Sequence, residues 1–227
     1  MRITRKDYHM FTGFTIDAID FMWNLRLNNN KAWFNDNKAT YQQVFQAPMK
    51  ALADEVFAKV SEEYKDHGFI RKVSRIYKDA RRIRDGEPYK TSLWFSIERP
   101  VEDWTYTPVF WFELGPESWS YGLGYYQAKA KTMQNFRARL DNAPAEFERL
   151  IAPLNNQTEF ILDGDEYARK KEAPTKLLEP WYNRKAFSLI HSQENGAELY
   201  TPDFATRLAN GYKSLMPIYD YFITLDD

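Results

Sequence analysis

A short central segment carries the side chains best suited to hold an anion. Residues 75–90 read RIYKDARRIRDGEPYK. Side chains alternate between the faces of a strand, so Arg75, Tyr77 and Asp79 are expected to share one face. That face would present a cation, a phenol and a carboxylate in one row. Arginine offers a planar fork of donors that matches phosphate or carboxylate, and the segment therefore predicts a site for a small anionic ligand.

The residues that follow this strand extend the predicted site. They form a loop with a turn at Asp85-Gly86, and they carry further cations and acids. The cations would contact the anion, and the acids would orient the cations. The ligand-binding residues predicted from this segment are Arg75, Arg81, Asp85 and Lys90.

Two residues of the segment could also take part in a reaction. Asp79 could orient a cation or act as a general base, and Tyr89 could donate a hydrogen bond. A hydrolase or transferase activity would follow, although the residues do not decide whether the chain is an enzyme. A structural interpretation is open as well, in which Asp79 and Asp85 pair with nearby arginines and fix a loop, because ion pairs are common and often contribute little.

Charge is unevenly placed along the chain. The 227 residues carry 31 basic and 32 acidic side chains, and the net charge is −1. Residues 71–90 hold eight basic and three acidic groups, so this segment is positive and the remainder is acidic. A balanced net charge makes a nucleic-acid or membrane partner held by global attraction unlikely. A local positive patch is typical of an anion site, and also of a solvated loop.

The sequence offers few residues for chemistry that needs a thiol, a metal or a cofactor. The chain has no cysteine, and its histidines, His9, His67 and His191, are far apart. Gly122-x-Gly124 lacks the third glycine and the parallel context of a nucleotide-binding fingerprint, and it is interpreted as the end of a strand. We therefore expect neither a metal nor a cofactor.

No stretch has the apolar length of a membrane span, and the N-terminus lacks the apolar core of a signal peptide. The absence of cysteine is compatible with a reducing compartment. We therefore expect a cytoplasmic protein with no membrane partner.

Hydrophobic spacing changes from helical to alternating and back again. A first helix is predicted over residues 15–28 from apolar side chains at helical spacing, namely Ile16, Ile19, Trp23 and Leu27. A second helical stretch starts near Lys31 and is interrupted at Pro48. Helices return near Gln127, and a last one is predicted from Thr201-Pro202, with a bend or restart at Pro217.

Short segments rich in aromatic and β-branched residues predict strands. Successive strands joined by short links imply antiparallel pairing. We predict an α+β fold in one domain over residues 1–227, with a central, mostly antiparallel sheet flanked by N-terminal and C-terminal helices. The predicted strands span residues 70–78, 92–98, 107–114 and 118–123, with two shorter ones near 158–162 and 186–191.

Two stretches of the chain match the pattern of a known family. The N-terminal match consists of Asn29, Asn30, Trp33, Phe34, Lys38 and Tyr41. The central match consists of Arg75, Ile76, Tyr77, Asp79, Arg81, Asp85, Pro88, Tyr89 and Lys90. Over about residues 11–222 the chain resembles the uncharacterised proteins of domain-of-unknown-function family 2461. The pattern departs at Lys78, Arg82 and Gly86.

The resemblance implies an α+β fold and a shared pocket, and it implies no particular reaction. It adds Arg137, on a later helix, to the expected ligand-binding residues. Asn29, Asn30 and Lys38 could line the same site, although helix capping is the simpler explanation for them.

Two alternatives to anion binding stay open. One is a non-catalytic module that binds a protein partner, because no recognisable nucleophile or cofactor loop is present and aromatic residues often anchor interfaces. It predicts an exposed apolar patch. The other is weak binding of single-stranded nucleic acid through the basic segment and nearby tryptophans, against which the acidic remainder of the chain argues.

Overall fold

A computed structural model of the chain describes residues 10–79, 81, 83 and 86–225. Within these ranges the helices and a single antiparallel sheet make an α+β fold, which confirms the predicted class. The strands lie in the order β1-β2-β3-β4-β6-β5. Their bounds are β1 Ile70–Val73, β2 Leu93–Glu98, β3 Pro108–Leu114, β4 Ser118–Tyr125, β5 Ile161–Asp163 and β6 Ser188–Glu194.

Helices precede, interrupt and follow the strands along the chain. The α-helices are α1 Ile16–Leu27, α2 Lys31–Asp36, α3 Lys38–Thr40, α4 Ala47–Glu63, α5 Ala130–Asn142, α6 Pro144–Ile151, α7 Glu179–Tyr182 and α8 Phe204–Ile223. A π-helical segment, η1 Tyr41–Gln46, joins α3 to α4. Short 3-10 turns are η2 Lys65–His67, η4 Trp104–Tyr106, η5 Ala152–Asn156 and η6 Ala197–Tyr200. Among the described helices, none combines the length and the apolar content needed to cross a membrane.

The alternating pattern located β3 because one face of this strand is buried more completely than the other. On β3, Phe110, Phe112 and Leu114 are fully buried, whereas Trp111 and Glu113 on the other face are half-buried. Side chains at alternate positions point to opposite faces, so this burial follows directly from the sequence. Each strand begins or ends within a few residues of its predicted range, except that the first one stops five residues early.

The chain divides into two compact units. The first comprises Met1–Ile97, Trp111–Ser120 and Ser192–Asn210, and the second comprises Glu98–Phe110, Tyr121–His191 and Gly211–Asp227. Strands β3, β4 and β6 and helix α8 contribute residues to both units. One domain over residues 1–227 therefore stays a prediction.

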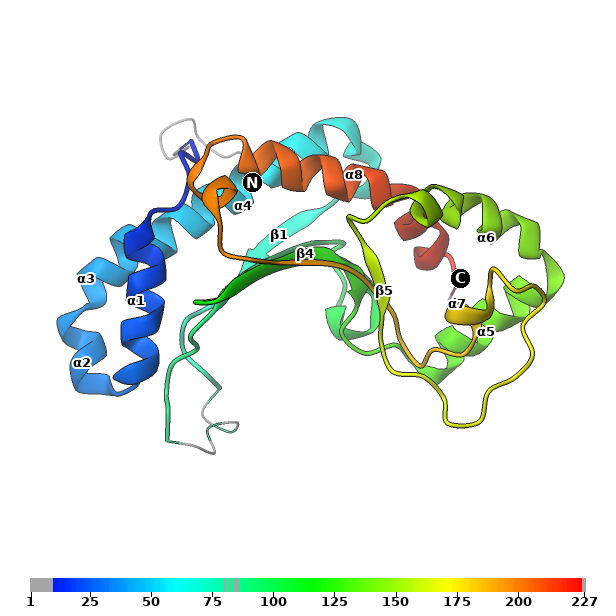
Figure 1. Cartoon of the computed structure of the whole chain (residues 1–227), viewed down its shortest axis with the longest axis horizontal. Coiled ribbons are helices and arrows are strands. Elements are labelled where there is room, and N and C mark those ends of the chain that lie inside the picture. The colour runs from blue at the N-terminus through cyan, green and yellow to red at the C-terminus, as the bar shows by residue number, and fades with distance from the viewer. Residues whose placement is uncertain (1–9, 80, 82, 84–85, 226–227) are drawn as a thin grey trace. The chain divides into compact units, whose positions relative to one another are not determined.

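In the first unit the N-terminal helices pack on one another and on the sheet. Helix α4 contacts β1 and η1, and α1 also contacts η1 (Figure 1). The core of this unit contains the rings of Phe112, Trp119 and Phe204. Trp119 is fully buried, and its ring meets that of Phe204 edge-on, with centroids 4.9 Å apart. Edge-to-face contacts of this kind add to the burial of apolar area.

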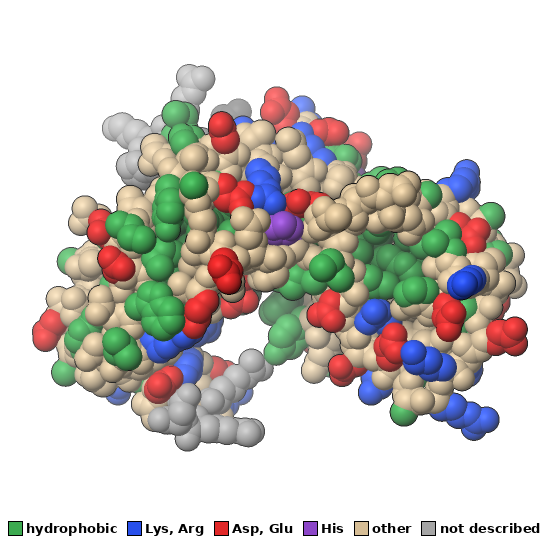
Figure 2. Space-filling view, viewed as in Figure 1, with side chains coloured by type: hydrophobic (Ala, Val, Ile, Leu, Met, Phe, Trp, Pro, Cys, Tyr) green, Lys and Arg blue, Asp and Glu red, His purple; other side chains and the backbone are tan. Residues whose placement is uncertain are grey.

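Helix α1 buries a different side from the one its spacing indicated. Ile16, Trp23 and Leu27 are 58%, 40% and 78% exposed. Apolar residues occur on two sides of this helix, and the inner side carries the more compact set. The buried residues are Ala18, Ile19, Phe21, Met22 and Leu25. Ile19 was correctly placed, whereas the other three mark an outer apolar face, and apolar side chains are visible over this part of the first unit in Figure 2.

The second unit has an aromatic core of its own. Phe187 and Phe222 lie with ring centroids 3.9 Å apart, and Phe136 and Phe147 meet edge-on at 5.1 Å. The carboxyl-terminal part of α8 supplies Phe222. The helix continues through Pro217, so it does not restart there, and a bend at this residue stays a prediction.

A close approach of two strands gives a test of the second unit. In β4, a Cβ atom on Gly122 would collide with the carbonyl oxygen of Leu189 in β6. We expect Gly122→Ala to lower the free energy of unfolding by about 1–3 kcal/mol, because overpacking forces the backbone to shift. Chemical denaturation measures this. In the control Gly115→Ala, the nearest atom would be the carbonyl oxygen of Ser118 at 3.5 Å, an ordinary contact. Equal losses in the two variants would contradict the prediction.

Candidate functional site

The chain beyond β1 forms a second, shorter antiparallel pairing. After Val73, residues 76–78 pair with residues 88–90 through a bridge between Tyr77 and Tyr89. Two backbone hydrogen bonds of 2.8 and 2.9 Å flank this bridge. The predicted strand over residues 70–78 is thus two pieces, with a break before the bridge.

The alternation expected from the sequence is present in this segment. Arg75, Tyr77 and Asp79 are all exposed, whereas Ile76 between the first two is 1% exposed. The cation, the phenol and the carboxylate therefore lie on the solvent side, and the apolar residue anchors the segment to the first unit.

Two residues from the N-terminal region, Asn29 in the link between α1 and α2 and Phe34 on α2, hold the bridge in place. The Asn29 amide nitrogen donates to the Tyr89 carbonyl oxygen (2.9 Å), and the Tyr89 N–H donates to the Asn29 amide oxygen (3.0 Å). The Phe34 ring stacks on the Tyr89 ring, with centroids 4.0 Å apart. Helix capping accounts for the neighbouring Asn30, which accepts from the Trp33 N–H (3.0 Å). Asn29 has the separate role of joining segments that are 60 residues apart.

A pocket of about 380 Å³ lies between residues 73–77 and the N-terminal helical elements α2, α3, η1 and α4. All of its lining residues belong to the first unit. Apolar side chains such as Phe34 and Ile76 form part of the wall. The charged and polar lining includes Lys38, Gln42, Gln46, Lys50, Arg75 and Tyr77. We call it the Arg75 pocket.

Three cations line the Arg75 pocket, and no acid appears in its lining among the described residues. The side chains of Lys38, Lys50 and Arg75 form no hydrogen bond or ion pair with any other residue that the structure describes. Like charges gathered at one place disfavour one another. A bound anion would offset this repulsion, so the pocket is chemically suited to phosphate or carboxylate groups.

The π-helical segment η1 supplies one wall of the pocket through Tyr41, Gln42 and Gln46. π-Helical turns are rare and occur frequently at functional sites. Tyr41 is 4% exposed, and its hydroxyl makes no well-aligned hydrogen bond with a described residue, although the Gln46 side chain is close to it. Burial raises the pKa of Tyr41 to about 12, and the hydrogen-bonding contact with the Gln46 side chain opposes that shift.

Asp79 and Arg81 pair with each other instead of lining the Arg75 pocket. The Arg81 side chain donates to both Asp79 carboxylate oxygens (3.1 and 2.7 Å), and it is 89% exposed. This hydrogen bond raises the pKa of Arg81. The pair has the geometry that the structural interpretation of the segment expected. Asp85 lies outside the described residues.

Lys90 and Tyr89 lie beside the pocket and not in its lining. The Lys90 ammonium sits over the Trp94 ring, 5.8 Å from its centroid. Burial lowers the pKa of Lys90, Glu113 opposes this shift, and Arg75 adds to it. Tyr89 is 3% exposed, and burial raises its pKa, so its phenol stays protonated and keeps its O–H donor.

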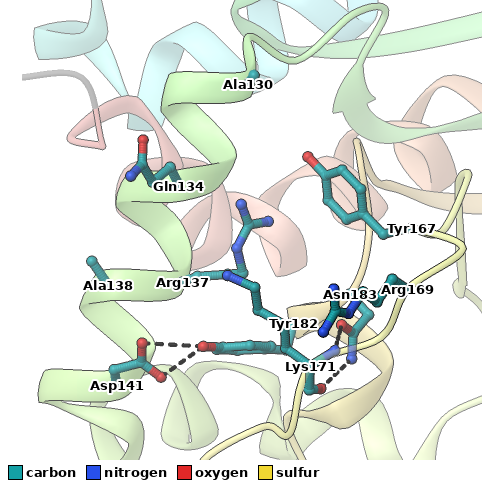
Figure 3. Close-up of a pocket in the computed structure, with 10 residues that line it drawn as sticks. All are labelled: Ala130, Gln134, Arg137, Ala138, Asp141, Tyr167, Arg169, Lys171, Tyr182 and Asn183. Carbon is teal, nitrogen blue, oxygen red and sulfur yellow. Dashed lines mark hydrogen bonds between the residues drawn. The ribbon is translucent and has the colours of Figure 1, made fainter.

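Arg137 belongs to the second unit, where it lines a pocket of about 570 Å³ (Figure 3). Every residue that lines this pocket comes from the second unit. The structure therefore gives Arg75 and Arg137 separate pockets, one in each unit. A single pocket shared by the two arginines stays a prediction.

These features define an α+β protein that has a cation-lined pocket in each of two units. The family model of the conserved hypothetical proteins called DUF2461 matches residues 17–221. The chain belongs to this family. A comparison with curated proteins found no match.

Sequence reasoning missed three polar residues of the Arg75 pocket, namely Gln42, Gln46 and Lys50. They lie on η1 and α4, more than twenty residues before Arg75, and their pattern is that of an ordinary exposed helix face. Only the resemblance pointed to this region, through Lys38 and Tyr41. No local signal in the sequence connects these helices with residues 73–77.

The Asn29 contact can be tested by substitution. We expect Asn29→Ala to lower the free energy of unfolding by about 1–3 kcal/mol, because it leaves both Tyr89 backbone groups without their partner. The Tyr89 amide should also exchange its hydrogen faster, as measured by NMR. Asn24→Ala is the control, since the exposed Asn24 side chain makes a single bond to the Asp20 carbonyl oxygen.

Asn29→Asp keeps the acceptor for the Tyr89 N–H but places a carboxylate oxygen against the Tyr89 carbonyl oxygen, so it should destabilise the protein at least as much as Asn29→Ala. If Asn29→Ala and Asn24→Ala have the same free energy of unfolding, the contact between Asn29 and Tyr89 does not hold the bridge.

Proposed function

We infer that the chain binds a small anionic ligand, bearing phosphate or carboxylate groups, in the Arg75 pocket. The observation that supports this most is the gathering of Lys38, Lys50 and Arg75 around one pocket without a described acid among its lining residues. Its volume of about 380 Å³ falls in the range of roughly 300–1,000 Å³ that small-molecule sites occupy.

The lining residues suit different parts of such a ligand. Arg75 can donate two parallel hydrogen bonds to one oxyanion, and the lysines add point charges that tolerate more than one ligand geometry. The amides of Gln42 and Gln46 can donate or accept, and the exposed Tyr77 hydroxyl can do the same. Phe34 and Ile76 are almost fully buried and back the pocket without offering surface to the ligand.

Binding is the activity that the geometry supports, and a reaction would need more. Asp79 is engaged by Arg81, and Tyr89 is buried beneath Phe34, so neither is placed to act in the Arg75 pocket. Their catalytic roles stay predictions. A cytoplasmic location, where small phosphorylated and carboxylated metabolites are abundant, is part of the same proposal.

The proposal predicts a specific loss of affinity. In isothermal titration calorimetry with inorganic pyrophosphate and with citrate as probes, Arg75→Ala should weaken binding about tenfold or more, because a charge-assisted contact is removed. Its melting temperature should stay near that of the wild type, since Arg75 makes no hydrogen bond or ion pair with a described residue. Lys50→Ala should have a smaller effect in the same direction, and affinity should fall as salt is added.

Arg81→Ala is the matched control, because it removes the same charge from the same segment but outside the pocket lining. If Arg81→Ala weakens binding as much as Arg75→Ala, the ligand is held by the net charge of the segment and not by the pocket. If neither probe binds the wild type at about 1 mM, anion binding at this site is wrong.

A second candidate function is interaction with a protein partner through α1. Ile16, Trp23 and Leu27 lie on one exposed side of this helix, and the Arg26 guanidinium sits over the Trp23 ring at 4.9 Å. Exposed apolar clusters with tryptophan and arginine are typical of binding surfaces.

This candidate predicts contacts that depend on the α1 face. A photo-cross-linking residue at position 27 should capture a defined protein in cells, and Ile16→Asp should abolish that product. The same cross-linker in place of Tyr126, an exposed aromatic residue of the second unit, is the control. Identical products from both positions would argue against a partner specific to α1.

A further inference from the structure

The second unit contains a pocket whose charges differ from those of an ordinary surface hollow. This pocket, of about 570 Å³, lies between α5 and the segment that connects β5 with α7. Its lining includes the cations Arg137, Arg169 and Lys171, and Asp141 is the acid in its described lining. We call it the Arg137 pocket.

The acid of this pocket already has a partner. Asp141 accepts hydrogen bonds from the Tyr182 hydroxyl at both carboxylate oxygens (2.9 and 3.1 Å), as the dashed lines in Figure 3 show. Burial, and then the hydrogen bond with Asp141, raise the pKa of Tyr182, so the phenol remains the donor. No described acid forms an ion pair with Arg137. The pocket thus keeps an excess of positive charge that its own carboxylate does not pair.

Arg137 contacts an aromatic ring without being neutralised. It projects from α5 toward Tyr167 on the opposite wall, and its guanidinium carbon lies 5.2 Å from the centre of that ring (Figure 3). One guanidinium nitrogen, Nη1, is shut off from water and has no acceptor among the described residues. Such a cation has lost part of its hydration and gains strongly from a nearby anion.

The wall opposite α5 is also preorganised. Asn183 is 4% exposed. Its amide oxygen accepts from the Lys171 N–H (2.9 Å), and its amide nitrogen donates to the Lys171 carbonyl oxygen (3.0 Å). The Asn183 carbonyl oxygen accepts from the Tyr167 N–H at 2.8 Å. These bonds fix the backbone that carries Tyr167, Arg169 and Lys171. Charges held on a fixed backbone lose less entropy when they bind a ligand.

We propose that the second unit has its own binding site for a small, multiply charged anion, a phosphate ester or a polycarboxylate, held by Arg137, Arg169 and Lys171. This site does not depend on the Arg75 pocket, because all its lining residues belong to the other unit. Arg137 gives the directed contact to one oxyanion. The two exposed cations select for additional negative charge, and Tyr167 holds the arginine in place.

The test uses the full chain with Arg75→Ala, so that the first pocket is disabled. Inorganic pyrophosphate and citrate are titrated separately by calorimetry, which distinguishes a preference for phosphate from one for carboxylate. One site should remain, and adding Arg137→Gln should weaken it about tenfold or more. Arg149→Gln, on the exposed surface of α6, removes the same charge from the same unit and should change the affinity less than twofold.

A paired variant covers the possibility that Arg137→Gln unfolds the protein. Arg169 and Lys171 are both exposed, so Arg169→Gln with Lys171→Gln should keep the melting temperature and still weaken binding about tenfold. The proposal is overturned if these folded variants bind like Arg149→Gln. It is also overturned if the Arg75→Ala chain binds neither probe at about 1 mM, an outcome that leaves the first pocket intact as the anion site.

Discussion

The Arg75 pocket depends on the way in which Asn29 and Phe34 hold Tyr89. The asparagine satisfies both backbone groups of Tyr89, and the phenylalanine covers its ring. Residues 88–90 in turn form the ladder that fixes residues 76–78, so a side-chain contact across 60 residues sets the position of Tyr77. This ladder has only three residues on each strand, which is too few to be stable alone, so it needs the contact with Asn29 and Phe34. The helices and the bridge must therefore form together for the pocket to exist.

A count of charges does not identify the cations that are available to a ligand. The segment over residues 71–90 is strongly basic, yet several of its cations have acidic partners: Arg71 pairs with Asp54, Lys78 with Glu87 and Arg81 with Asp79. Each pair places opposite charges side by side and leaves little net field. Arg75 has no such partner among the described residues, and it lines one pocket together with Lys38 and Lys50 from other elements. Pairing, and not the local density of basic residues, decides which cation can bind.

The fold was more predictable than the site because the two depend on different ranges along the chain. Strand positions follow from alternation within six or seven residues, and β3 shows this in the burial of Phe110 and Phe112. The inner side of α1 was not predictable, because large apolar residues lie on two of its sides. Lys50 joins Arg75 only through the packing of α4 against β1, for which no local pattern exists. The family resemblance supplied Lys38 and Tyr41 where periodicity could not.

Tyr41 gives a physical reason to regard the Arg75 pocket as more than an accident of packing. The Tyr41 hydroxyl is buried, and its contact with the Gln46 side chain falls short of a well-aligned hydrogen bond, whereas phenylalanine would fill nearly the same space with no polar group to satisfy. The residue also begins a π-helical segment, whose geometry is less favourable than that of a continuous α-helix. Two local costs at the wall of one cation-lined pocket are difficult to explain by stability alone. Natural proteins depart from locally optimal choices chiefly at functional sites, and both costs fall on the wall of the pocket that we propose binds the anion.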